Sequence, residues 1–175
     1  MGNQQSGGGS NLTPRSRPQL TPEDVATLPL VRHLVYASLS EHVYNEPDRR
    51  TLPAGWRMLM SADEVELNKE GYYAAAYINE KLRHCIIAER GTHDALGIRA
   101  GVWMYFDEPT IQFALAEQFS KLVRLRLALT KEHGGAEPYF VSYTGHSLGA
   151  VLAACRAVAE HTYAITFESP GCRAF

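Results

Sequence analysis

The sequence has few cysteines, and their spacing suits neither a metal site nor a disulfide framework. Its 175 residues contain three cysteines, Cys85, Cys155 and Cys172. Structural metal sites need cysteine or histidine pairs at short spacings, and disulfide-stapled domains carry an even number of cysteines in an oxidising compartment. We therefore expect reduced thiols in a cytoplasmic protein, with no metal.

Long apolar runs and a strong net charge are also absent. No stretch approaches the roughly 18 consecutive apolar residues of a membrane-spanning helix, and no apolar secretory segment is visible at the N-terminus. The formal net charge of −2 gives no case for a nucleic-acid partner. Hydrophobic residues make up 45% of the chain and charged residues 21%, the ordinary composition of a globular domain.

The N-terminal segment is of low hydrophobicity. Residues 1–20 are rich in Gly, Ser, Gln, Asn and Pro, so we expect a disordered tail and a domain over 21–175. Gly2, followed by Ser6, fits the N-myristoylation pattern. The alternative is a plain flexible tail in which these residues reflect composition only. A single myristoyl chain binds membranes weakly, so the two alternatives are a reversible peripheral membrane protein and an untethered one.

Hydrophobic spacing predicts alternating strands and helices. Apolar residues four apart indicate a helix over 31–44. A longer apolar stripe indicates a second helix over 109–133, and its residues are Ile111, Leu115, Phe119, Leu122, Leu125 and Leu129. The remaining expected elements are strands at 56–59, 72–78, 85–88, 139–144 and 162–167 and a helix at 148–160. This order predicts an α/β fold with a mostly parallel sheet flanked by helices.

One motif in this pattern carries chemistry: Gly145-His146-Ser147-Leu148-Gly149. A Gly-x-Ser-x-Gly sequence between a strand and a helix is typical of a nucleophile elbow, a sharp turn that presents the serine above the sheet. The helix start offers free N–H groups to a developing oxyanion, so the Leu148 N–H is the expected first donor. Two glycines also suit a plain tight turn, but the preceding apolar strand and the following alanine-rich helix favour the catalytic interpretation.

These residues resemble the fungal-type (class 3) lipases of the α/β-hydrolase superfamily. The elbow block, the segment 85–92 (CIIAERGT) and the segment 165–171 (ITFESPG) match in order, except that Glu168 stands where the family usually has Gly. The resemblance implies Thr92 as the second oxyanion contributor. It also implies a lid or acyl-chain wall at Trp103, Met104, Tyr105 and Phe106, a segment that suits a core strand equally well.

The resemblance implies a triad in the order serine, acid, histidine, and this chain does not supply it. After Ser147 the acids are Glu160 and Glu168 and the histidine is His161, about 20 Å along the helix from the elbow. Upstream, His93 and His146 fit a surface or core role better than that of a base. We therefore expect a partial hydrolase domain, truncated before its last strands.

Two functions follow as alternatives. The first is a serine hydrolase, with no cofactor, that cleaves carboxylic esters of acylglycerols or phospholipids through a Ser147 acyl-enzyme. The second is a non-catalytic lipid-binding or interaction module that keeps the elbow but lacks the triad acid and histidine. A membrane surface is a possible partner in either case.

Overall fold

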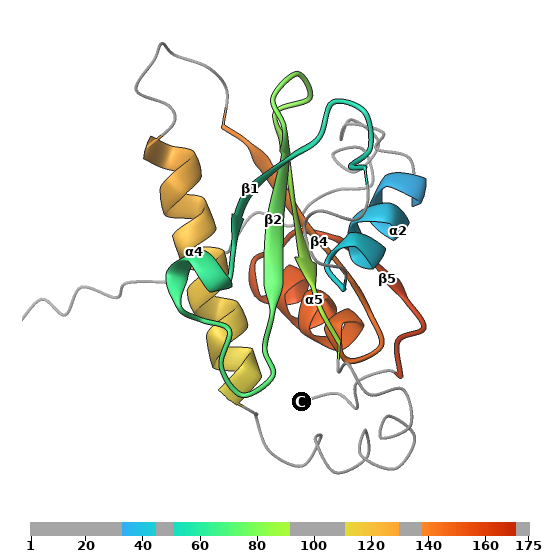
Figure 1. Ribbon diagram of the computed structural model, residues 1–175, viewed down its shortest axis with the longest axis vertical. Helices are drawn as coiled ribbons and strands as arrows, with labels where there is room; N and C mark the ends of the chain where they lie inside the picture. Colours follow the sequence, from blue (N-terminus) through green and yellow to red (C-terminus); the bar gives the residue numbers. More distant parts are fainter. Residues whose placement is uncertain (1–32, 45–50, 92–110, 130–137, 171–175) are drawn as a thin grey trace, which may run out of the picture.

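A computed structural model describes residues 33–44, 51–91, 111–129 and 138–170 (Figure 1). The predicted tail 1–20, which includes Gly2, lies outside these ranges. Among the described helices, none combines the length and the hydropathy that crossing a membrane requires.

The core of the molecule is a five-stranded sheet in the order β1-β2-β3-β4-β5. The strands are β1 (Arg57–Ser61), β2 (Ala74–Asn79), β3 (His84–Glu89), β4 (Phe140–His146) and β5 (Ala164–Phe167). Short connections make β1–β2 and β2–β3 antiparallel, while β3–β4 and β4–β5, which are separated by helices, are parallel. The predicted α/β fold is confirmed, with a mixed sheet.

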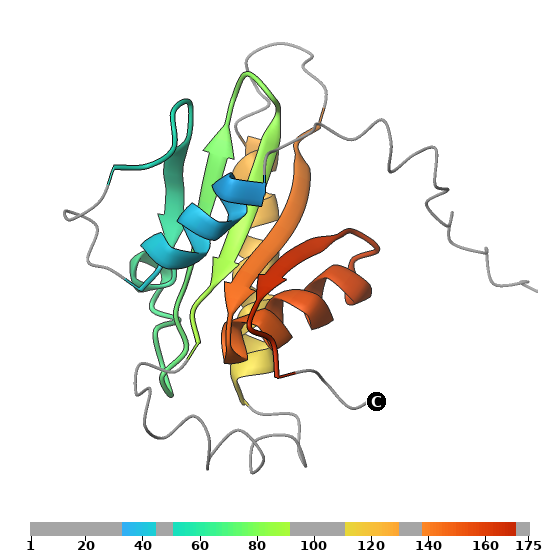
Figure 2. The same cartoon turned by 90° about the vertical axis from the view of Figure 1, so that its right-hand side faces the viewer.

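Helices cover both faces of this sheet (Figure 2). Helix α2 (His33–His42) packs on one face, where Tyr36 and Leu39 meet Tyr77 and Ile86. Helices α4 (Ile111–Leu129) and α5 (Leu148–Ala159) cover the other face, where Phe119 lies in the same core as Ile87. Every residue of β2 and β3 is buried, as expected for strands enclosed between two helical layers.

The face of α4 differs from the predicted stripe. Leu115 and Phe119 are buried as expected, but Ile111, Leu125 and Leu129 are all more than half exposed. The helix turns 3.6 residues per turn, and its buried side instead includes small and polar side chains: Gln112, Ala116, Ser120, Val123 and Leu127. The stripe drawn from large apolar residues alone was therefore wrong at its ends.

Strand ends shift by a few residues, and one element was missed. The strand predicted over 56–59 runs over Arg57–Ser61, while the helix predicted over 109–133 is described over Ile111–Leu129 and its predicted ends lie outside the described residues. A short 3-10 helix, η1 (Asp63–Val65), had no prediction. Because β3, β4 and β5 run parallel, their carboxyl ends meet at one edge of the sheet, and the elbow lies there.

Candidate active site

Ser147 occupies the junction between β4 and α5. Its backbone lies at φ 56° and ψ −125°, a conformation that costs an L-residue free energy and that concentrates at functional sites. The Ser147 N–H donates to the Phe167 carbonyl at 3.1 Å, and its own carbonyl accepts from the Ala150 N–H at 3.0 Å. The side chain makes no cap hydrogen bond to the helix it precedes, and the residue is 6% exposed. Neighbouring strands and the helix therefore hold the strained turn.

The two elbow glycines are required by close backbone contacts. A Cβ on Gly145 would lie 2.3 Å from the Gly149 carbonyl oxygen, and a Cβ on Gly149 would lie 2.1 Å from the Glu89 carbonyl oxygen. No real side chain tolerates such distances, so the turn packs on both itself and the end of β3. This is the steric reason for the Gly-x-Ser-x-Gly spacing.

The oxyanion side of the site is described only in part. Leu148 is the first residue of α5, so its N–H is one of the free donors at the helix start. Thr92 and the segment Trp103, Met104, Tyr105 and Phe106 lie outside the described residues. Gly91, which precedes Thr92, lies against the elbow: a Cβ there would be 2.7 Å from the His146 carbonyl oxygen. The chain therefore reaches Thr92 from beside the elbow.

The His146 side chain is engaged away from Ser147, between two residues of other segments. Its Nε2 lies 3.0 Å from Glu168 Oε2, and its Nδ1 lies 3.2 Å from the Tyr44 hydroxyl. No motif or spacing in the sequence pointed to Tyr44. Glu168 did carry a signal, because it departs from the family's usual glycine beside the elbow strand.

The other candidate acid and histidine after Ser147 lie at the far end of α5. Glu160 accepts hydrogen bonds from Ser120 at 2.6 Å and from Arg156 at 2.7 Å, and it also pairs with Arg124. Burial acts to raise the pKa of Glu160, but these bonds outweigh it and hold the pKa near 2. His161 follows directly, with its N–H donating to the Val158 carbonyl. Glu160 thus ties α4 to α5, at the end of α5 opposite Ser147.

A second serine and a histidine form a pair inside the core. His84 Nε2 lies 2.8 Å from Ser142 Oγ, and Tyr36 Oη lies 2.7 Å from the same hydroxyl. Burial lowers the pKa of His84 to about 4, so the ring is neutral at pH 7. Both side chains are fully buried at 0% exposure, in a regular part of the sheet that no substrate reaches.

A buried carboxyl lies directly beneath the elbow. Glu89 ends β3, pairs in register with Gly145, and is fully buried. Burial raises its pKa to about 8, against smaller opposing effects of Tyr72 and Arg156. Among the described residues neither carboxyl oxygen has a hydrogen-bond partner of good geometry. At pH 7 Glu89 is therefore mainly protonated.

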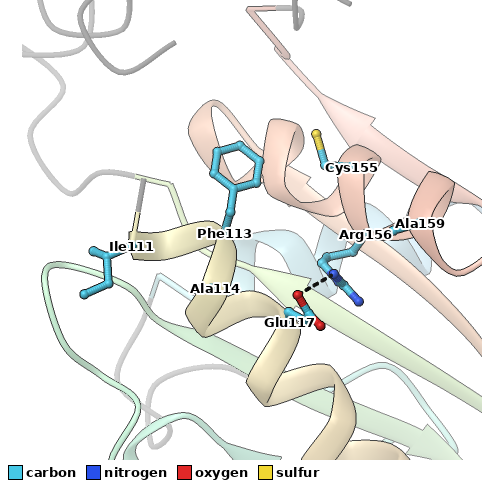
Figure 3. A pocket seen from close by; sticks show the side chains of 7 residues that line it. All are labelled: Ile111, Phe113, Ala114, Glu117, Cys155, Arg156 and Ala159. Atoms are coloured by element: carbon cyan, nitrogen blue, oxygen red, sulfur yellow. Dashed lines mark ion pairs between the residues drawn. The ribbon is translucent and has the colours of Figure 1, made fainter. Parts of the chain in front are cut away.

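The structure also has a hollow of about 400 Å³ between α4 and α5 (Figure 3). Phe113 lines it from α4 and Cys155 from α5, and Glu117 pairs with Arg156 at 4.0 Å. Its remaining lining residues are Ile111, Ala114 and Ala159. Cys155 lies about 10 Å along α5 from Leu148, so this hollow is separate from the elbow. Among the described residues, no group of three or more His, Cys, Asp or Glu could hold a metal.

Comparisons with known proteins agree with this geometry. The chain matches a crystal structure of the Lip2 lipase from Yarrowia lipolytica with a TM-score of 0.53 and 13% sequence identity, covering 87% of this chain. It spans 62% of the Lip2 chain. At this identity the likeness shows the α/β-hydrolase fold alone, and it confirms the fold that the lipase resemblance implied. No curated protein sequence matches.

A family model identifies the family of this chain. The model describes the Tle-like phospholipase domain of phospholipase-like proteins, and it matches residues 35–174. This range contains the whole described sheet, the Ser147 turn and the segment that leads to Thr92. The chain therefore belongs to the Tle-like phospholipase domain family.

Proposed function

We propose that this chain carries the nucleophile of a serine hydrolase that cleaves carboxylic esters of lipids. The observation that supports it most directly is the backbone of Ser147, at φ 56° and ψ −125°. Two glycines that tolerate no Cβ enclose it, at the start of a helix. The family description favours a phospholipid over an acylglycerol as the substrate.

In the proposed reaction, the Ser147 hydroxyl attacks the ester carbonyl carbon while its proton passes to a base. The Leu148 N–H and Thr92 bind the oxyanion of the tetrahedral intermediate. Collapse breaks the bond to the leaving alcohol, which takes up the proton, and water then releases the acyl group as a carboxylic acid. We place the base and the triad acid in the part of the fold that Lip2 has and this chain does not span.

The alternative is a non-catalytic lipid-binding or interaction module. It is favoured by one observation: His146, the histidine nearest to Ser147 in sequence, has both ring nitrogens engaged with Tyr44 and Glu168. Without a base, only the residual catalysis of an oxyanion hole would remain.

Two further proposals concern residues outside the described ranges. We propose that Trp103, Met104, Tyr105 and Phe106 line the acyl-chain site as a wall or lid. We also propose myristoylation of Gly2, giving reversible attachment to a membrane surface. Mass spectrometry of the protein from its natural source tests the latter: loss of Met1 with a myristoyl increment supports it, and an unmodified N-terminus refutes it.

Covalent labelling of the protein at its natural length by a fluorophosphonate tests the main proposal, because this reagent reacts with serines that a base activates. We expect one label on Ser147, lost in Ser147→Ala and retained in Ser142→Ala, which removes a hydroxyl of the same strand. A folded wild-type protein that takes no label would support the binding module. If Ser147 is labelled, the fatty acid released from phosphatidylcholine vesicles is compared with the fatty acid released from a triacylglycerol emulsion. The faster release identifies the substrate class.

A further inference from the structure

The Tyr44 hydroxyl connects three segments that are far apart in the sequence. Tyr44 follows α2, where its N–H bonds to the Glu41 carbonyl. Its hydroxyl accepts a hydrogen bond from the Gly91 N–H at 2.9 Å and donates to the His146 carbonyl at 3.1 Å. A phenol has one proton and two lone pairs, so one group can serve both partners at once.

The contact with Gly91 is tight and specific. A Cβ on Gly91 would lie 2.6 Å from the Tyr44 hydroxyl oxygen and 3.3 Å from the Gly149 nitrogen. The residue before it, Arg90, is also held, with its N–H on the Tyr73 carbonyl at 2.9 Å and its guanidinium 4.6 Å from the centre of the Tyr73 ring. Tyr44 thus ties the backbone of Gly91, the residue before Thr92, to the elbow.

The His146 ring holds the Tyr44 hydroxyl from the other side. The two rings meet edge to face at 5.8 Å and 74°. The Tyr44 hydroxyl lies 3.1 Å from the His146 carbonyl oxygen and 3.2 Å from its Nδ1, distances typical of a proton shared between two acceptors. Nδ1 then acts as an acceptor, so the ring proton sits on Nε2 and points to Glu168 at 3.0 Å. The carboxylate of Glu168 fixes this tautomer.

Glu168 makes this contact in an unfavourable backbone conformation. Its φ is 47°, in the left-handed region that favours glycine, which is the residue that the class 3 lipases usually have here. The side chain is 83% exposed, so packing does not explain a glutamate at this position. The contact that the structure shows for its carboxylate is the one with His146 Nε2.

We propose that Tyr44 is a positioning residue that holds Gly91, the residue before the proposed oxyanion contributor Thr92, on the elbow, and that the His146–Glu168 pair orients the Tyr44 hydroxyl. This inference rests on the proposed function. Oxyanion donors stabilise the transition state only when they are aimed in advance, and shifts of about 1 Å cost up to a hundred-fold in rate. Tyr44 supplies this alignment because it bonds both to the residue before Thr92 and to the residue before Ser147.

The first test compares Tyr44→Phe with Tyr163→Phe. The Tyr163→Phe variant also loses a partly buried hydroxyl contact, to Tyr36 at 2.7 Å, but near the start of the strands. Amide hydrogen exchange measured by NMR reports the Gly91 N–H directly. We expect Tyr44→Phe to raise its exchange rate about five- to ten-fold, the factor that one lost hydrogen bond gives, and Tyr163→Phe to leave it unchanged. Equal rates in wild type and Tyr44→Phe would overturn the inference.

The second test is kinetic and uses Glu168 as well. We expect Tyr44→Phe to lower kcat and the fluorophosphonate labelling rate about ten- to a hundred-fold with KM unchanged. Glu168→Ala should lower both several-fold, and Glu168→Gln, whose amide oxygen still accepts from Nε2, should restore them. Because Glu168 is exposed, its variants do not threaten folding.

The outcomes separate the two proposals. A labelled wild type with Tyr44→Phe and Glu168→Ala labelled equally fast would overturn the positioning role and leave the nucleophile standing. An unlabelled wild type would overturn the proposed hydrolase and this inference together.

Discussion

The two ends of the parallel strands hold different kinds of polar group. Near their starts, His84, Ser142, Tyr36 and Tyr163 form a chain of hydrogen bonds in the core. At their carboxyl ends, Glu89 is buried without a good hydrogen bond among the described residues, and Ser147 sits in a strained turn. Each end has a serine from the β4 region and a histidine nearby.

The comparison shows that a Ser–His hydrogen bond does not make a nucleophile. Ser142 has such a bond at 2.8 Å, but it lies in a regular strand with no exposure and its partner is held neutral by burial. Ser147 makes no such bond to its neighbour His146. It instead lies at the start of α5, in the sharp turn of a nucleophile elbow. Satisfied polar networks stabilise one end, and strain is concentrated at the other, as is usual at functional sites.

The largest expected effect separates the two serines. Ser147→Ala should reduce ester hydrolysis at least about a thousand-fold, since the nucleophile is lost. Ser142→Ala should keep hydrolysis and lower the free energy of unfolding by about 1–3 kcal/mol, because His84 and Tyr36 lose a buried partner. Initial rates and urea denaturation measure both. If Ser142→Ala lost activity in a folded protein, the division between the two ends would be wrong.

Next in size is the effect of a Cβ at the elbow. Gly149→Ala should destabilise the protein by about 3 kcal/mol or more, because its Cβ would overlap the Glu89 carbonyl and both backbones must move. Gly71→Ala is the control: its φ of 75° is unfavourable for alanine, but the nearest atom is 3.7 Å away, so only about 1–2 kcal/mol is expected from the backbone conformation alone. Equal losses in thermal unfolding would show that the close approach at Gly149 costs no more than an unfavourable backbone conformation.

Changes in pH should affect the two ends in opposite directions. Glu89 has its pKa raised from 4.5 to about 8, so between these values the unfolded chain releases a proton that the folded protein keeps. Its contribution to stability is present below pH 4.5 and is lost as pH rises through 8, by up to about 1.4 kcal/mol per pH unit. Glu89→Gln should flatten this slope in urea denaturation across pH 5–8. An unchanged slope would refute the buried neutral carboxyl.

His84 provides the comparison on the acid side. Its pKa is lowered from 6.5 to about 4, so the unfolded chain binds a proton there before the folded protein does. Stability should therefore fall as pH falls from 6.5 toward 4. His84→Gln should remove this loss while leaving the alkaline slope of Glu89 in place.

The smallest effect compares two tyrosine hydroxyls. Tyr36→Phe removes the hydroxyl that bonds both Tyr163 and Ser142 and should lower the free energy of unfolding by about 1–2 kcal/mol without changing the labelling of Ser147. Tyr44→Phe should do the reverse, with a small change in stability and a slower label. If Tyr36→Phe also lowered the rate of fluorophosphonate labelling in a folded protein, the two hydroxyls would not have different roles.

Much of this arrangement could be predicted from the residues. The strands around Ile86 and Tyr143, the helix after Ser147 and the steric need for Gly145 and Gly149 follow from local rules of period and turn geometry. The predicted α4 stripe was partly wrong because Ser120 and Gln112, though polar, lie on the buried side of the helix and have hydrogen-bond partners there. Those partners, Tyr143 and the Glu70 carbonyl, come from distant segments that periodicity does not reveal.

The sequence by itself determined the α/β order, the strained turn and its serine, because each depends on residues that are adjacent along the chain. Only the tertiary structure decided what surrounds that turn. Tyr44, Gly91, His146 and Glu168 come from four separate segments, and no spacing links them. Burial likewise decided that Glu89 is neutral and that His84 holds Ser142 in the core, because desolvation depends on which chain segments cover a group and not on its neighbours in sequence.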